Sequence, residues 1–195
     1  MFDMKNLELN KLITPDSVLF FDMDGTLIDT DYANFLSYRK AIKTVLQDDV
    51  DLSYNPHQRL NRSLLQCTIP NLTEEELKLI IEEKEKCYNN YLSETQLNSK
   101  MKKILSAYFR RNRTVLVTNC RKDRALATLS HHELSDMFSD FLFRQIDGNK
   151  KINKFQNAIV KLGISPNLVI VFENEESEIK DAINAGIKYI NPKIS

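Results

Sequence analysis

The sequence predicts an α/β fold whose central sheet is parallel, and three short apolar segments carry this prediction. They span residues 17–22, 114–118 and 168–172 and read SVLFFD, TVLVT and LVIVF. Each is long enough for one buried strand, and each is followed or ended by polar residues. Helical patterns separate these segments, and strands that alternate with helices form βαβ units with parallel strands. Weaker strands are expected at 141–143 and 188–190.

Two helices are expected in the C-terminal part of the chain. Apolar residues recur at helical spacing over 152–162, and Gly163 follows as a stop signal. A shorter helix over 177–185 is followed by Gly186, which favours a C-terminal cap. These helices are expected to cover the sheet, because each connects two of its strands.

The stretch from residue 31 to residue 95 interrupts this alternation. It has helical periodicity and no strong strand pattern. Thr73 and Glu76 have the spacing of a capping box, which predicts the start of one helix. We therefore expect a helical insertion, or cap, at 31–95 within a core made of residues 1–30 and 96–195.

The composition predicts a cytoplasmic protein that binds neither nucleic acid nor membranes. Lys and Arg number 27, and so do Asp and Glu, so the chain offers no strong electrostatic attraction for polyanions. Its apolar runs are too short to span a bilayer, and the first twelve residues lack the apolar segment of a signal peptide. Three widely spaced cysteines fit a reducing compartment.

The segment DMDGTLIDT, at residues 22–30, has the strongest chemical signature. Side chains alternate along a strand, so Asp22 and Asp24 point the same way at the strand end. Gly25 then allows the chain to turn sharply. Two adjacent carboxylates repel each other, and a hard cation such as Mg²⁺ relieves that repulsion. One carboxylate can attack a phosphoryl group while the other moves a proton.

This segment closely resembles the first motif of the haloacid dehalogenase (HAD) superfamily of phosphotransferases and phosphatases. The resemblance implies a Rossmann-like core and catalysis by an aspartate nucleophile with Mg²⁺. Asp22 would become an aspartyl-phosphate, while Asp24 would protonate the leaving oxygen and then activate the hydrolytic water. The carboxylate of Asp22 and the main-chain carbonyl of Asp24 would ligate Mg²⁺.

The second motif of the family is a Thr or Ser that ends the next core strand. Thr118 matches it, directly after the apolar run that ends at Val117. The resemblance implies that its hydroxyl holds a phosphate oxygen, with help from Asn119.

The third motif is a lysine near the start of the helix that precedes the last strong strand. Lys150, Lys151 and Lys154 are the candidates, and the usual Lys-Pro pattern is absent. Such a lysine would offset the negative charge of the nucleophile and of the phosphate. We favour Lys154, with Lys151 as the alternative.

The fourth motif is an acidic cluster after the last strong strand. Relatives often read Phe-Glu-Asp-Ser here, whereas this chain reads FENEESEI at 172–179. Asn174 thus stands where relatives have an aspartate that ligates the metal. It can ligate through its carbonyl oxygen, and Glu173 or Glu178 could supply the missing carboxylate. The expected metal ligands are Asp22, Asp24, Glu173 and Asn174.

Further cations follow the second strand. Arg121, Lys122 and Arg124 are expected at a solvated helix end, although Arg121 or Lys122 could instead contact a phosphate-rich substrate.

Together these features predict Mg²⁺-dependent hydrolysis of a small phosphorylated metabolite. The insertion matches the small cap of the β-phosphoglucomutase and phosphoglycolate phosphatase branch in position and size. Two alternatives stay open. One is phosphoryl transfer, as in a sugar-phosphate mutase. The other is a chain weakened by Asn174, which binds a phosphorylated ligand or a protein partner without turnover.

Overall fold

A computed structural model describes residues 7–47, 50–147 and 150–191. The chain divides into two compact units. The core unit comprises Met1–Leu27 and Asn98–Ser195, and the cap unit comprises Ile28–Leu97. The helical insertion expected at 31–95 lies within the cap unit.

The core unit is built on a five-stranded sheet whose paired strands all run parallel. This confirms the predicted α/β class with a parallel sheet. All five expected strands are present, with ends within one residue of those predicted. In spatial order they are β5 (Asp140–Leu142), β4 (Arg113–Val117), β1 (Val18–Phe21), β8 (Val169–Phe172) and β9 (Tyr189–Ile190).

The register of the three central strands aligns their carboxyl ends. Phe21, the last residue of β1, pairs with Leu116 of β4 and with Phe172 of β8. The rings of Phe21 and Phe172 stack with their centroids 4.7 Å apart. The polar residues that follow β1, β4 and β8 therefore emerge along one edge of the sheet, where parallel sheets bind their ligands.

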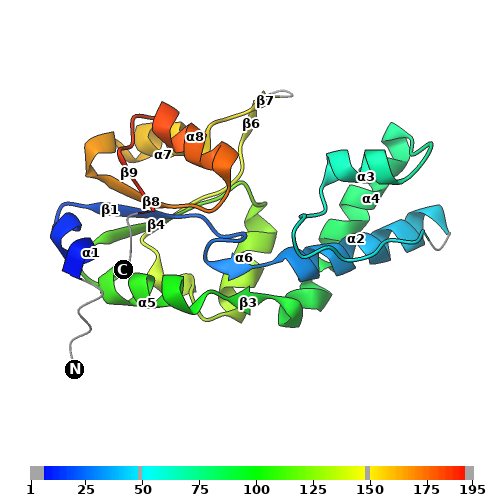
Figure 1. Ribbon diagram of the computed structural model, residues 1–195, viewed down its shortest axis with the longest axis horizontal. Coiled ribbons are helices and arrows are strands. Elements are labelled where there is room, and N and C mark those ends of the chain that lie inside the picture. Colours follow the sequence, from blue (N-terminus) through cyan, green and yellow to red (C-terminus); the bar gives the residue numbers. More distant parts are fainter. Residues whose placement is uncertain (1–6, 48–49, 148–149, 192–195) are drawn as a thin grey trace. The chain divides into compact units, whose positions relative to one another are not determined.

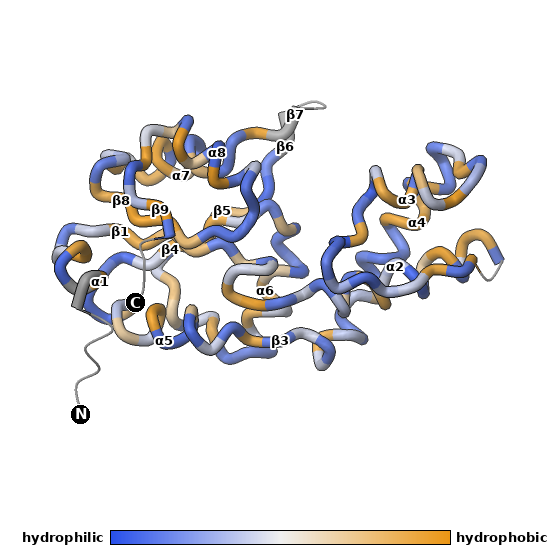
Figure 2. Tube along the Cα trace, viewed as in Figure 1, coloured by the Kyte–Doolittle hydropathy of each residue, from blue (hydrophilic) through white to orange (hydrophobic). Residues whose placement is uncertain are grey.

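Helices cover both faces of this sheet (Figure 1). On one face lie α7 and α8, which pack against a cluster that includes Phe20, Val117 and Phe155. Figure 2 shows hydrophobic residues running along β4 and β8 beneath them. The helices of the core unit are α1 (Leu7–Leu12), α5 (Ser99–Tyr108), α6 (Lys122–His131), α7 (Lys154–Leu162) and α8 (Glu176–Asn184), with 3₁₀ turns at Ser135–Met137 and Pro166–Leu168.

The ends of α7 are set by two residues with clear local roles. The side chain of Asn153 accepts hydrogen bonds from the backbone amides of Phe155 and Gln156, as an N-cap residue does. Gly163 closes the helix with φ +62°, the left-handed conformation that glycine adopts at low cost. Lys154 is therefore the first residue of α7. A lysine near the start of this helix is what the third motif requires.

The cap unit consists of helices linked to a short antiparallel ribbon. Its largest contact is between α2 (Asp31–Leu46) and α4 (Glu74–Cys87), around a cluster that includes Tyr38, Leu65 and Ile80. Thr73 and Glu76 form the predicted capping box at the start of α4. The elements are β2 (Ile28–Asp29), α2 (Asp31–Leu46), α3 (Arg62–Thr68), α4 (Glu74–Cys87), the 3₁₀ segment Tyr88–Glu94 and β3 (Gln96–Leu97).

The remaining described elements of the core unit are two short strands. The strands β6 (Ile146–Asp147) and β7 (Lys150–Lys151) pair antiparallel just before α7. Across residues 7–47, 50–147 and 150–191, no helix combines the length and the apolar character needed to cross a membrane.

Candidate active site

Three buried polar side chains meet at the carboxyl edge of the core sheet. Asp22 follows β1, Thr118 follows β4, and Glu173 follows β8. The amide of Asp22 donates to the carbonyl of Phe172 over 3.0 Å, so the pairing of β1 with β8 extends one residue beyond the strands. This extension fixes Asp22 beside Glu173.

Lys154 reaches into the same edge from the first turn of α7. Its Nζ lies 2.7 Å from Asp22 Oδ1, 2.7 Å from Glu173 Oε2 and 3.5 Å from Glu178 Oε2. Its side chain is only 5% exposed and that of Asp22 only 7%. One ammonium group is therefore shared by three carboxylates in a space that largely excludes water.

This sharing determines the electrostatics of the cluster. Burial raises the pKa of Asp22 to about 7; Lys154 opposes this shift, while the charges of Glu173 and Asp24 add to it. Burial alone would lower the pKa of Lys154, but the carboxylates of Asp22, Glu173 and Glu178 raise it above its usual value. Lys154 thus stays charged, and the surrounding carboxylates keep an excess of negative charge.

Several hydrogen bonds hold Glu173 in place. Its Oε1 accepts hydrogen bonds from the backbone amides of Asn174 and Glu175, over 2.8 and 3.0 Å. The side-chain amide of Asn191 bonds to both the amide and the carbonyl of the Glu173 backbone. Glu173 Oε2 contacts Lys154, so backbone amides and one ammonium group together offset the charge of the Glu173 carboxylate.

Asn174 lies against the turn that follows Asp24. The hydroxyl of Thr26 donates to Asn174 Oδ1 over 2.7 Å. Gly25 has φ +82°, and a Cβ atom at residue 25 would lie 2.6 Å from Asn174 Nδ2. Glycine is needed at this position for both its conformation and its size, because any side chain would displace the amide of Asn174.

The donor chemistry at this edge fits a hard divalent cation. Four carboxylates, from Asp22, Asp24, Glu173 and Glu178, face two cationic side chains, those of Lys154 and Arg124. When Asp22 is ionised, the excess of two negative charges is what one divalent ion would balance. No group of three or more His, Cys, Asp or Glu side chains in the described part of the chain is arranged to hold a metal by itself. In any such site, main-chain and amide oxygens, such as those of Asp24 and Asn174, would have to complete the ligand set.

The two residues predicted to bind phosphate make contacts within the protein. Thr118 Oγ1 accepts a hydrogen bond from the amide of Cys120 over 3.1 Å. Asn119 Nδ2 donates to both carboxylate oxygens of Glu178, over 3.0 and 2.9 Å. Asn119 Oδ1 is buried and has no hydrogen-bond partner among the described residues. Asn119 thus orients Glu178, which in turn contacts Lys154.

The expectation that Arg124 lies at a solvated helix end is wrong, because its side chain is largely buried. Its Nη2 lies 3.4 Å from Asp24 Oδ2, and its side chain is only 12% exposed. Its Nε donates to the sulfur of Cys120 over 2.8 Å. No local sequence pattern indicates this contact, because Arg124 reaches Asp24 only when α6 packs beside the turn that follows β1.

The structure does not test the two alternative lysines. Lys150 and Lys151 form β7, and their side chains lie outside the described part of the structure. Lys154 is the described lysine that reaches Asp22.

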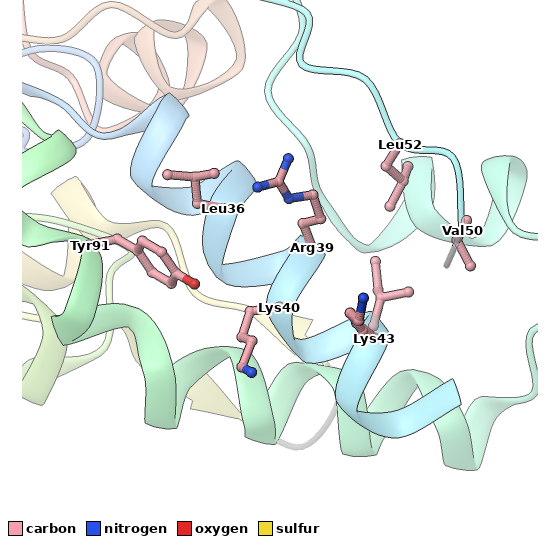
Figure 3. A pocket seen from close by; sticks show the side chains of 8 residues that line it. Leu36, Arg39, Lys40, Lys43, Val50, Leu52 and Tyr91 are labelled. Carbon is pink, nitrogen blue, oxygen red and sulfur yellow. The ribbon is translucent and has the colours of Figure 1, made fainter. Parts of the chain in front are cut away.

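The cap unit has cavities of its own. One of about 350 Å³ is lined by Leu36, Val50, Leu52 and Tyr91, together with three cations of α2. Figure 3 shows these cations, Arg39, Lys40 and Lys43, along the helix. A second, of about 210 Å³, lies around Tyr54. None of the residues predicted for catalysis lines either of these two cavities.

Comparison with known proteins agrees with the resemblance seen in the motif at 22–30. The model of the haloacid dehalogenase-like hydrolases matches residues 19–191. The phosphorylated carbohydrates phosphatase of Thermotoga maritima is 25% identical over 181 residues, covering 88% of this chain and 82% of that protein.

Solved structures share the fold at low identity. CbbY from Rhodobacter sphaeroides, solved with phosphate, has a TM-score of 0.71 at 16% identity, covering 91% of this chain and 86% of its own. A protein of Haemophilus somnus described as a predicted phosphoglycolate phosphatase has a TM-score of 0.72 at 22% identity, covering 90% and 84%. The relationship predicted from the motif at 22–30 is confirmed, and with it the prediction of a phosphatase-type enzyme. The chain belongs to the haloacid dehalogenase-like hydrolase family.

Proposed function

We propose that this protein hydrolyses a small phosphate monoester with the help of Mg²⁺, through an aspartyl-phosphate at Asp22. The observation that carries the proposal is the buried contact of Asp22 with Lys154, in a cluster with excess negative charge. A carboxylate oriented in this way, at the carboxyl end of a central strand, is suited to attack a phosphorus atom. Lys154 would stabilise the negative charge that gathers on the transferring phosphoryl group.

The proton transfers fall to Asp24. Two residues after Asp22, it would donate a proton to the leaving oxygen and later take one from the attacking water. The hydroxyl of Thr118 and the backbone amides after it would bind the phosphate oxygens. Asp22, the carbonyl of Asp24 and the amide oxygen of Asn174 would hold Mg²⁺. The ion would supply charge neutralisation between the nucleophile and the phosphoryl oxygens.

The substrate class in this proposal is a phosphorylated carbohydrate. Support comes from the phosphatase of Thermotoga maritima, named for such substrates, and from a CbbY variant solved with xylulose-1,5-bisphosphate. A neutral formal charge on the whole chain also favours a small ligand over a polyanion.

The test is phosphate release from p-nitrophenyl phosphate and from a panel of sugar phosphates, with and without Mg²⁺. Asp22→Asn is the matched control, because it keeps the shape of the side chain and removes the nucleophile. Release that needs both Mg²⁺ and Asp22 is the expected result. Release that persists in Asp22→Asn contradicts the proposal. Absence of release together with absence of Mg²⁺ binding in calorimetry favours a binding protein without turnover.

A further inference from the structure

We propose that Arg124 is a positioning residue that holds the carboxylate of Asp24 in place for proton transfer. The inference rests on the proposed function, in which Asp24 moves the proton. It assigns a role to a side chain that the reaction scheme above does not use.

The guanidinium group of Arg124 is fixed at two different atoms. Its Nη2 faces Asp24 Oδ2 at 3.4 Å, and its Nε donates to Cys120 Sγ over 2.8 Å. The guanidinium is planar and rigid, so two contacts through different nitrogens set its orientation as well as its place. Cys120 in turn donates its amide to Thr118 Oγ1. Arg124 thus links the turn after β1 to the turn after β4.

Burial indicates that this contact is maintained. The exposed fractions are 12% for the Arg124 side chain and 16% for that of Asp24. When one partner of such a pair is removed, the other keeps its charge in a poorly solvated place. An ion pair of this kind is more persistent than one between two solvated side chains.

The position of Arg124 in its helix points the same way. Arg124 occupies the first turn of α6, whose amino end carries a positive partial charge. A cation is unfavourable there, and Arg121 and Lys122 stand at the same helix end. The carboxylate of Asp24 offsets this charge at Arg124, whereas Arg121 pairs with the exposed Asp123.

The contact with Arg124 would orient the Asp24 carboxylate for catalysis. Proton transfer needs the carboxyl oxygen within hydrogen-bond reach of the leaving oxygen, and small displacements reduce the rate strongly. A side chain tethered by Arg124 samples fewer orientations than a free one. The effect should therefore appear in kcat rather than in substrate binding.

The experiment compares Arg124→Met, Arg124→Lys and the exposed control Arg110→Met, using the full chain, Mg²⁺ and p-nitrophenyl phosphate. For Arg124→Met, kcat should fall on the order of 10- to 100-fold, while KM changes by less than about threefold. Arg124→Lys should recover part of the loss, since an ammonium group can keep one contact. Arg110→Met should leave both constants unchanged. Unchanged kcat in Arg124→Met overturns the proposal, and a rise in KM alone reassigns Arg124 to substrate binding.

Urea unfolding of Asp24→Asn, Arg124→Met and the double variant tests the contact without turnover. Effects on the free energy of unfolding that do not add are expected for a coupled pair, and additive effects overturn the contact. If the wild-type protein shows no phosphatase activity, the proposed function fails and the catalytic role of Arg124 fails with it. If the wild-type protein is active and Arg124→Met matches it, only the role of Arg124 fails.

Discussion

The ammonium group of Lys154 lies 2.7 Å from Asp22 Oδ1, although 132 positions separate the two residues in the sequence. The parallel register of β1 with β8 and the Asn153 cap of α7 bring them together. The same ammonium contacts Glu173 at 2.7 Å. Lys154 therefore links the proposed nucleophile to the acidic residue after β8, and its removal should affect both chemistry and stability.

Replacement of Lys154 by Met should lower turnover by about 100-fold or more, because the charge on the transferring phosphoryl group loses its nearest cation. The matched control is Lys161→Met, which changes an exposed lysine of the same helix. Steady-state phosphate release measures both variants. Equal rates in Lys154→Met and wild type would contradict the role given to this lysine.

Lys154→Met should also make stability depend more strongly on pH. Lys154 lowers the pKa of Asp22, so without it the pKa of Asp22 in the folded state rises further and the folded protein binds more protons than the unfolded one. The free energy of unfolding then falls as pH rises. We expect a loss of about 3 kcal/mol at about pH 8 and a smaller loss at about pH 5. Urea unfolding at the two pH values measures this, and a loss that is larger at the lower pH would contradict it.

The pKa of Asp22 predicts how Mg²⁺ stabilises the wild-type protein. Its value is about 7 when folded, against 3.8 for an unperturbed group, so Asp22 opposes folding increasingly as pH rises through this range. A bound divalent cation favours the ionised form and removes that cost. The rise in melting temperature with Mg²⁺ should therefore be larger at about pH 7.5 than at about pH 5. Asp22→Asn should lose this pH dependence, and an equal rise at both pH values in the wild type would argue against Asp22 as a ligand.

Asn174→Asp should strengthen Mg²⁺ binding on the order of tenfold, since it adds one ligand charge. The Thr26 hydroxyl that donates to Asn174 Oδ1 can donate equally to a carboxylate, so the turn should stay intact. Asn167→Asp, on an exposed residue before β8, controls for net charge. Calorimetry with Mg²⁺ measures the affinities. Unchanged affinity in Asn174→Asp would place residue 174 outside the metal site.

Gly25→Ala and Gly163→Ala form a matched pair. Both glycines have positive φ, at +82° and +62°, so alanine should reduce the free energy of unfolding by about 1 kcal/mol at either site. At residue 163 nothing lies within 4 Å of the new Cβ, whereas at residue 25 it meets the amide of Asn174. Only Gly25→Ala should weaken Mg²⁺ binding and phosphate release. Equal effects of the two variants on activity would show that strain alone matters.

Much of the core could be predicted because its signals are local. A short apolar run that ends in polar residues defines a strand and its chemical end, as 17–22 does. The capping box of Thr73 and Glu76 and the stop at Gly163 depend on neighbours in sequence, and both are present. The choice among Lys150, Lys151 and Lys154 was open, because spacing alone does not tell which side chain turns inward.

Contacts between segments that are far apart in the sequence could not be predicted from such local patterns. The basic residues after β4 look alike in sequence, yet Arg124 is buried against Asp24 while Arg121 is half exposed and pairs with Asp123. The packing of α6 beside the β1 turn makes this difference. Likewise, the hydrogen bonds that Glu173 accepts from backbone amides and Lys154 depend on the loop conformation after β8.

The most direct test of the central claim is to detect the phosphoryl group on Asp22. The protein would be mixed with substrate and Mg²⁺, quenched in acid within the first turnover, and analysed by intact mass and peptide mapping. The account predicts an added phosphoryl group in the peptide that contains residues 22–30, absent in Asp22→Asn. A protein that turns over substrate while the phosphoryl group sits on another residue, or on none in any quench, would contradict nucleophilic attack by Asp22.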